Sequence, residues 1–139
     1  MLVSSRTGWV AAGAALALAT TVLAQSQAPG FDPRLLMQQP MSDTPDKVIA
    51  LVAVTLAPGA QSPPHTHPGE CIGSVVEGAI ELHAAGQPVR NLKAGDPFSN
   101  PRGTVHQFVN SSGQPVRMLT TVVQDKDKPR LQVVPAMPK

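Results

Sequence analysis

Short runs of β-branched and apolar residues, separated by Pro, Gly, Asn and Asp, make up most of the chain from residue 47 onwards. The longest run is KVIALVAVTL, residues 47–56, and it ends at a Pro-Gly turn. Six further strands are predicted over residues 71–78, 79–86, 87–96, 103–113, 114–124 and 130–135. Beyond residue 24, no stretch sustains a helical period of apolar residues over ten or more positions. The pattern therefore predicts an all-β domain, built as an antiparallel sandwich or barrel.

Two details of this pattern carry further predictions. Residues 71–78 and 79–86 are predicted to form a hairpin about Glu77-Gly78. The first strand has apolar residues on both faces, with Val48, Ala50, Val52 and Val54 alternating with Ile49, Leu51 and Ala53. A strand that is apolar on both faces needs cover on both, so we expect a second subunit on its outer face and hence a homodimer.

The N-terminal part of the chain has a different composition. Residues 1–24 contain one Arg, an apolar run over residues 9–23 and small residues at Val22 and Ala24, which is typical of a secretory signal peptide cut after Ala24. The alternative, a retained membrane anchor, normally needs about 20 consecutive apolar residues, more than this run has. We therefore expect a periplasmic or secreted protein with no membrane association after cleavage.

The rest of the chain divides into an arm and one domain. Residues 25–45 are rich in Pro, Gln and Ser and are predicted to form an extended arm, with RLLM at residues 34–37 as its only apolar anchor. Residues 46–135 are predicted to form a single β-barrel domain, because the length that remains suits one core and not two.

Charge and cysteine content limit the classes of partner. The formal net charge is +2, and the tail DKDKPR alternates acids with bases, so there is no basic surface for nucleic acid or an anionic membrane. Cys71 is the single cysteine, so it cannot form an intramolecular disulfide. In an exported protein we expect its thiol to be buried, bound to a metal or bridged to another chain.

Three of the four histidines suggest a metal site. His65 and His67 are two residues apart, so in an extended segment both side chains project from the same face. His106 lies on another predicted strand, which folding of a β-sandwich can bring close to the first two. Taken alone, the His-x-His pattern is also compatible with two hydrogen-bonded histidines in a Pro-rich turn.

Two motifs make the chain resemble the cupin family. GAQSPPHTHPGECIGSVVEG, residues 59–78, and GDPFSNPRGTVHQFVN, residues 95–110, have the residues and intervals of the two motifs of that family. The matching positions are Gly59, His65, His67 and Gly78 in the first motif and Gly95, Pro101, Gly103, His106 and Asn110 in the second. The resemblance implies a jelly-roll or double-stranded β-helix barrel. It also implies a metal held by His65, His67, His106 and a glutamate of the first motif.

This sequence departs from the family at that glutamate. The intervals from His67 and from Gly78 both place the position at Cys71, and Glu70 is one residue short. Strand parity agrees, because residues 65, 67, 69 and 71 share a face if the backbone stays extended. The predicted metal ligands are therefore His65, His67, Cys71 and His106. Two alternatives stay open: Glu70 as the fourth ligand, or a three-histidine site beside an inert thiol.

A thiolate in the ligand set changes the expected metal. Three imidazoles and a thiolate are softer than three imidazoles and a carboxylate, which favours zinc, copper or ferrous iron over manganese or magnesium. If an exported chain acquires its metal outside the cytoplasm, the general affinity order of divalent metals favours copper and zinc over manganese and iron. We expect copper or zinc first and iron second.

The surroundings of the site predict a small apolar pocket for a small-molecule ligand. Gly73 shares the parity of Cys71 and is expected to leave space beside the metal, whereas Phe108 is expected in the core. Arg102 could meet an anionic substrate, although a solvated loop charge is the simpler interpretation, and Asn110 holds a position that is structural in the family.

No general acid or base can be assigned, so the catalytic residues are unknown and whether the chain is an enzyme stays open. Among enzymes, a metal-dependent oxygenase acting on a small organic molecule needs few such groups, because the metal carries the redox step. The alternative is a non-catalytic periplasmic cupin that binds a metal or a small ligand.

Overall fold

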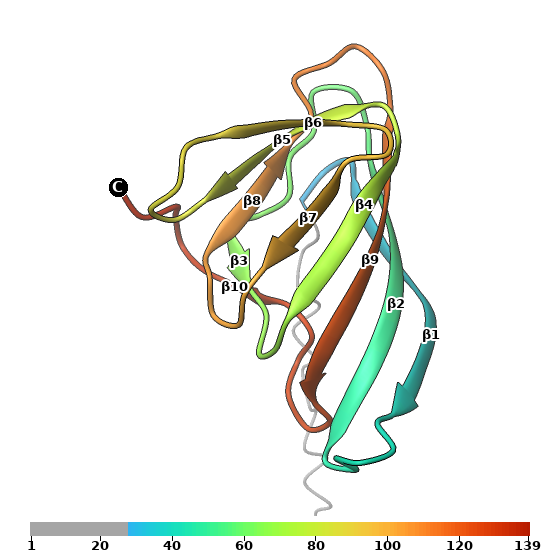
Figure 1. Cartoon of the computed structure of the whole chain (residues 1–139). Helices are drawn as coiled ribbons and strands as arrows, with labels where there is room; N and C mark the ends of the chain where they lie inside the picture. Colours follow the sequence, from blue (N-terminus) through green and yellow to red (C-terminus); the bar gives the residue numbers. More distant parts are fainter. Residues whose placement is uncertain (1–27) are drawn as a thin grey trace, which may run out of the picture.

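The structure, a computed structural model, describes residues 28–139 and shows an all-β domain in this part of the chain. Its strands form two five-stranded antiparallel sheets that face each other (Figure 1). One sheet has the order β1-β2-β9-β4-β7 and the other β10-β3-β8-β5-β6. The strands are β1 (Phe31–Pro40), β2 (Lys47–Leu56), β3 (His65–Thr66), β4 (Cys71–Glu77), β5 (Ala79–Ala84), β6 (Arg90–Lys93), β7 (Pro97–Asn100), β8 (His106–Val109), β9 (Val116–Asp125) and β10 (Gln132–Val133). The predicted all-β fold is confirmed, while the signal-peptide prediction for residues 1–24 lies outside the described residues.

The core lies between the two sheets, and the alternation along the strands accounts for it. Strands β2 and β9 pair over their whole length, from Lys47 opposite Asp125 to Leu56 opposite Val116. Every second residue of both strands is buried, which agrees with the parity expected for β2. These side chains meet Leu82, Phe108 and other residues of the second sheet in one hydrophobic cluster.

The predicted hairpin about Glu77-Gly78 is wrong. Strand β4 pairs with β7 and β9, whereas β5 pairs with β6 and β8 in the other sheet. Gly78 is the corner where the chain passes between the sheets, with a φ of 87°. A Cβ there would lie 2.8 Å from the carbonyl oxygen of Pro115, so the glycine meets both a backbone and a packing requirement. Turn residues between two apolar runs mark such a corner as readily as a hairpin.

The expected arm contributes a strand to the first sheet. Strand β1 pairs with β2 from Phe31 opposite Leu56 to Pro40 opposite Val48. Phe31 is buried in the core, whereas Leu35, Leu36 and Met37 are about half exposed, at 49%, 52% and 57%. The apolar anchor is therefore Phe31 and not the RLLM segment. Backbone hydrogen bonds to β2 hold the rest of β1 in place.

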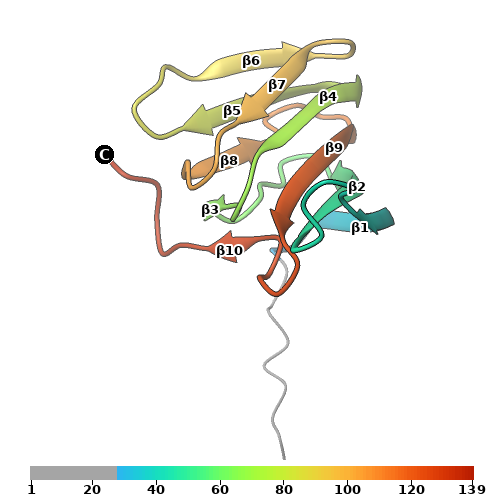
Figure 2. The ribbon, with the colours of Figure 1, turned by 60° about the horizontal axis from the view of Figure 1, so that its bottom comes forward.

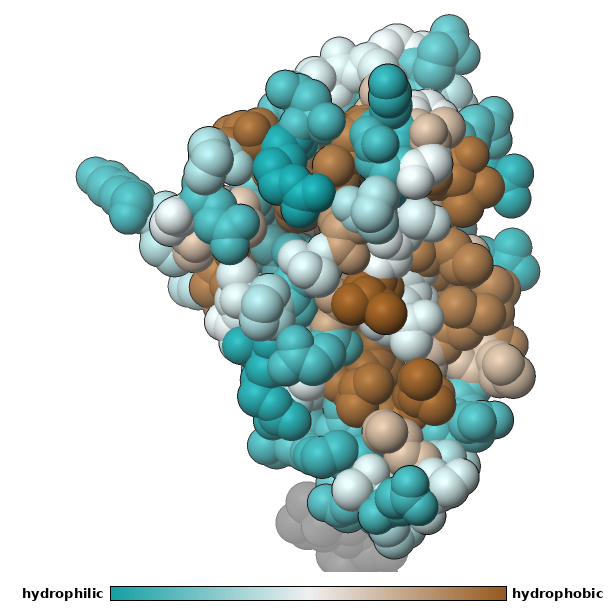
Figure 3. Space-filling view, in the orientation of Figure 1, coloured by the Kyte–Doolittle hydropathy of each residue, from teal (hydrophilic) through white to brown (hydrophobic). Residues whose placement is uncertain are grey.

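The outer face of the first sheet is unusually apolar. Ile72, Val76 and Leu119 are exposed there, on the neighbouring strands β4 and β9. Figure 3 shows apolar side chains across this side of the molecule. None of the described residues belongs to a helix long and apolar enough to span a membrane.

After β9 the chain crosses to the second sheet through residues 126–134, which we call the C-terminal strap (Figure 2). Its end pairs with β3 as β10, with Gln132 opposite Thr66 and Val133 opposite His65. The Val134 amide also donates to the carbonyl of Pro64 at 2.9 Å. The strap is thereby fixed to the segment that carries the first two histidines.

Candidate metal centre

Strands β3 and β8 bring the two histidine motifs together. His65 begins β3 and lies directly opposite His106, the first residue of β8. The segment before β3 is tied to β8 through Ser62, whose amide donates to the carbonyl of Phe108 at 2.9 Å and whose hydroxyl accepts from the Phe108 amide at 3.0 Å. Backbone pairing thus fixes the relative positions of the two motifs.

Each imidazole is oriented by a backbone carbonyl. The Nδ1 atom of His65 donates to the carbonyl of Pro63 at 2.7 Å, that of His67 to Arg130 at 2.6 Å, and that of His106 to Thr104 at 3.0 Å. With the proton held on Nδ1, every ring presents the lone pair of Nε2. This second layer of hydrogen bonds is typical of metal-ligating histidines.

The three rings converge on one point. Their centroids are 4.2 to 5.1 Å apart, and their ligand atoms all lie within 4.8 Å of one another. The Nε2 atom of His106 is buried and has no hydrogen-bond partner in the described part of the chain. A buried nitrogen with a free lone pair is costly unless something binds it, so the donor set fits a metal ion.

Burial keeps the metal-free histidines neutral. Burial and the neighbouring His106 lower the pKa of His65 to about 3, and burial lowers the pKa of His106 to about 4. Burial also lowers the pKa of His67, although its hydrogen bond to Arg130 opposes the shift. The rings are therefore in the deprotonated form that a metal requires throughout the neutral pH range.

The side chain of Cys71 is buried in the barrel, whereas that of Glu70 faces the solvent. Glu70 is exposed, whereas Cys71 is only 2% exposed and lies at the start of β4, opposite Val122 and Asn100. The cluster of converging ligand atoms consists of the three histidines and does not include the Cys71 sulfur. Burial raises the pKa of the Cys71 thiol to about 12, so without a metal it is protonated. Cys71 as the fourth ligand remains a prediction.

The turn between His67 and Cys71 is packed against β9. A Cβ on Gly69 would lie 1.5 Å from the carbonyl oxygen of Val123, so only glycine fits there. The Val123 amide donates to the carbonyl of Glu70 at 2.8 Å. This close approach of two backbones sets where Cys71 enters the barrel.

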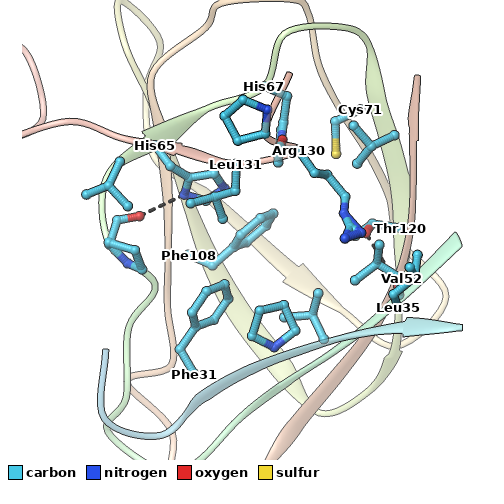
Figure 4. A pocket seen from close by; sticks show the side chains of 16 residues that line it. Phe31, Leu35, Val52, His65, His67, Cys71, Phe108, Thr120, Arg130 and Leu131 are labelled. Carbon is cyan, nitrogen blue, oxygen red and sulfur yellow. Dashed lines mark hydrogen bonds between the residues drawn. The ribbon is translucent and has the colours of Figure 1, made fainter. Parts of the chain in front are cut away.

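A cavity of about 290 Å³ adjoins the histidines (Figure 4). His65, His67 and Cys71 line one part of it, and Phe31 and Phe108 line another. The apolar pocket expected from the sequence is therefore present. Gly73 does not contribute its space, because the ring of Phe98 fills the position beside it, 2.6 Å from where a Cβ would be.

Two polar residues near the centre, Arg130 and Asn100, are not among the site residues predicted from the sequence. Arg130 belongs to the tail DKDKPR, in which acids alternate with bases and for which no site role is predicted, yet it lines the cavity. The only sequence signal was the predicted strand over residues 130–135, which begins at Arg130. Asn100 is buried beside Cys71 in the strand register, and its amide atoms have no partner among residues 28–139. Nothing in its motif position pointed to that.

Arg102 and Asn110 lie as the sequence predicts. Arg102 is exposed, and its guanidinium lies 3.8 Å from the Asp125 carboxylate, in agreement with the solvated interpretation. Asn110 is fully buried and donates to the carbonyls of Leu56, Ala57 and Gln114 at 3.3, 3.0 and 2.8 Å. Its role is structural, because it ties the carbonyls at the end of β2 to a carbonyl of the loop before β9.

Comparison with known proteins agrees with this arrangement. The family model for the cupin domain matches residues 52–122, about half of the chain, and includes all three histidines. The chain is a cupin. The cupin is 34% identical over 76 residues to germin-like protein subfamily 2 member 1 of Arabidopsis thaliana. It is 39% identical over 74 residues to a cupin-domain-containing oxidoreductase of Neurospora crassa.

These alignments cover only part of each protein. They include 51% of the cupin and 35% of the Arabidopsis protein, and 52% of the cupin and 37% of the Neurospora protein. The cupin thus spans about a third of the length of these curated relatives.

Solved structures give the same picture of the fold. A structure of oxalate oxidase in complex with the substrate analogue glycolate superposes with a TM-score of 0.61 at 25% identity, covering 76% of the cupin and 56% of that chain. The polyketide cyclase RemF from Streptomyces resistomycificus superposes with a TM-score of 0.61 at 28% identity, covering 77% of the cupin and 72% of that chain.

Proposed function

We propose that this chain is an exported metal-binding cupin that acts as a metal-dependent oxygenase on a small organic molecule. His65, His67 and His106 hold the metal, and Cys71 is its fourth ligand. The single observation that carries the proposal is the convergence of three buried, neutral imidazoles with free Nε2 atoms beside an apolar cavity. Similarity to an oxalate oxidase and to an oxidoreductase supports oxidation as the type of reaction.

The residues of the chain divide the work between them. A redox-active metal at this site supplies the electron transfer that dioxygen chemistry needs. The backbone carbonyls hold the imidazoles in one tautomer and orientation. Phe31, Phe108 and Leu131 keep the cavity apolar, which excludes water and strengthens every electrostatic interaction inside it.

The metal assignment is tested with Cys71→Ser and, as a matched control one residue away, Glu70→Gln. Purified protein is analysed for metal content, and zinc and copper affinities are measured by competition with a chelator. We expect Cys71→Ser to weaken binding of both metals and to abolish the thiolate charge-transfer band of the copper form, whereas Glu70→Gln leaves both unchanged. Manganese as the dominant metal after exposure to equimolar metals, or loss of binding in Glu70→Gln alone, would contradict the assignment.

Oxygen uptake tests the activity. Protein loaded separately with copper, zinc or iron is screened against small organic molecules in an oxygen electrode, with His106→Asn as the metal-deficient control. We expect uptake that requires a redox-active metal and is absent from the zinc form. No uptake with any metal would count against the oxygenase.

A non-catalytic metal binder is the second candidate, and the buried thiol favours it. Three histidines and Cys71 would form a four-ligand set, which is the closed arrangement of structural zinc sites, whereas a catalytic metal keeps an open position. An absorption spectrum of the cobalt-substituted protein separates the two. A spectrum that small anions leave unchanged indicates a closed site and supports the binder.

Export is supported by the composition of residues 1–24 and is tested by locating the protein in fractionated cells. Terminal sequencing of periplasmic protein should begin at Gln25. A chain that keeps Met1 in the cytoplasm would refute export.

Dimerisation is supported by the exposed apolar outer face of β4 and β9, where Ile72 and Leu119 also line a groove. Light scattering on the purified protein should give a dimer, and Ile72→Lys should give a monomer. Val89→Lys, on an exposed apolar residue before β6, is the control and should leave the dimer intact. A monomeric wild-type protein would contradict the prediction.

A further inference from the structure

The cavity beside the histidines contains one fixed charge. Of its lining residues, all of which lie in the described part of the chain, Arg130 is the only one with a permanently charged side chain. The lining includes no carboxylate, and its three ionisable neighbours, His65, His67 and Cys71, are neutral without a metal. Arg130 therefore places a positive charge in a mainly apolar space.

One nitrogen of the Arg130 guanidinium has no hydrogen-bond partner in the described part of the chain. Its Nη1 atom is buried and makes no hydrogen bond within residues 28–139, and no described carboxylate forms an ion pair with it. The guanidinium stays protonated, because arginine is not deprotonated in proteins. A buried donor on an unpaired cation is costly, so an anion in the cavity would stabilise it.

The backbone of Arg130 is held independently of its side chain. The carbonyl oxygen accepts the His67 Nδ1 hydrogen bond at 2.6 Å, and the next residues pair with β3. The side chain runs from the strap into the cavity and ends beside Thr120 and Val52 (Figure 4). One residue thus holds a metal ligand with its main chain and presents a cation with its side chain.

We propose that Arg130 binds the carboxylate of a small organic monoanion in this cavity, with the apolar part of the ligand against Phe31, Phe108 and Leu131. A guanidinium pairs with a carboxylate through two parallel hydrogen bonds, so it fixes orientation as well as charge. The cavity is at the small end of the range for ligand pockets, which suits an acid with one short chain or one ring. A single cation neutralises one carboxylate and leaves a second one uncompensated in an apolar space. The inference rests on the proposed function in so far as this acid is the substrate.

The test uses benzoate and hexanoate as probes, with benzyl alcohol and hexanol as neutral analogues and oxalate as a dianion. Binding to the metal-free full chain is measured by calorimetry. We expect both monocarboxylates to bind more tightly than their alcohols and than oxalate. Arg130→Met should weaken carboxylate binding about tenfold or more and leave the alcohols unaffected. Arg130→Lys, which keeps the charge and loses the planar fork, should be intermediate.

Two controls separate charge recognition from damage to the site. Arg102→Met removes an exposed guanidinium within the second motif, outside the cavity lining, and should leave carboxylate binding unchanged. Zinc should bind at least as tightly to Arg130→Met as to wild type, because the carbonyl that holds His67 remains and a positive charge near the site is removed. Equal binding of benzoate by wild type and Arg130→Met, equal binding of benzoate and benzyl alcohol by wild type, or no binding of either acid would overturn the inference.

The outcomes also distinguish this inference from the proposed function. Intact zinc or copper binding without Arg130-dependent carboxylate binding refutes the anion site alone. Carboxylate binding that depends on Arg130 in a chain that binds no metal refutes the oxygenase alone.

Discussion

Acid should destabilise the metal-free protein, because its buried histidines resist protonation. In the unfolded chain a histidine has a pKa near 6.5, whereas burial lowers the pKa of folded His65 to about 3 and that of His106 to about 4. Below pH 6.5 the unfolded chain therefore takes up protons that the folded chain does not. The stability that the two neutral histidines contribute is fully present above pH 6.5. It is lost as the pH falls towards their pKa values in the folded protein.

The size of this loss follows from the same values. At pH 5 each of the two residues is about 1.5 pH units below its unfolded pKa and still above its folded one. One unit corresponds to about 1.4 kcal/mol, so each histidine contributes about 2 kcal/mol and the pair about 4 kcal/mol of lost stability between pH 8 and pH 5. A domain with a total stability of about 5–15 kcal/mol would lose a large fraction of it.

Urea unfolding at pH 8, 7, 6 and 5 in the presence of a chelator measures this loss. Far-ultraviolet circular dichroism is the suitable probe, because the chain has no Tyr and its single Trp, Trp9, precedes the described residues. The two carboxyl groups with a lowered pKa, Glu81 and Asp125, titrate below this pH range and do not interfere. In His106→Asn the loss should shrink by about 2 kcal/mol, whereas His83→Asn, on the outer side of β5, should keep it.

A free energy of unfolding that stays constant between pH 8 and pH 5 would refute the reasoning. So would an equal loss in wild type and His106→Asn, because the protons would then be taken up elsewhere.

Three further changes have defined outcomes. Gly69→Ala places a methyl group against a β9 carbonyl oxygen and should lower the melting temperature by at least about 5 °C, whereas Gly113→Ala, at a position with open space, should not. Asn110→Ala leaves three backbone carbonyls without this side-chain donor and should lower the free energy of unfolding by about 3 kcal/mol; a loss below 1 kcal/mol would contradict its structural role. Removing residues 129–139 deletes the carbonyl that holds the second imidazole and should weaken zinc binding about 10- to 100-fold, whereas removing residues 136–139 should leave zinc affinity unchanged.

The sequence was informative where a residue's neighbours along the chain determine its surroundings. The alternation in β2 predicted the buried face, and the two motifs predicted that His65, His67 and His106 meet. Parity and interval counts both placed Cys71 inside the barrel and Glu70 outside, which is how the structure places them. Whether the thiol binds a metal is a separate question, which the metal-binding experiments address.

The predictions that were wrong concern residues whose surroundings are determined by strands distant in the sequence. Gly78 carries a turn signal, but which strands it separates depends on the pairing of β4 with β9 and of β5 with β8. Gly73 has the parity expected of a gap, yet a ring from β7 fills it. The predicted strand over residues 130–135 begins at Arg130, but where this side chain lies depends on the pairing of the two-residue strand β10 with β3.

The C-terminal strap supplies the charged residue of the cavity from outside the region that carries the three histidines. The three histidines lie within residues 65–106, inside the region that the cupin family model matches, whereas Arg130 follows that region. A mutation of Arg130 changes the charge of the cavity and leaves intact the carbonyl that orients His67. A single substitution at this position can therefore change the charge of the cavity while the three-histidine cluster stays intact. Close homologues with the same histidines but another residue at this position are where a different preference for charged ligands is expected.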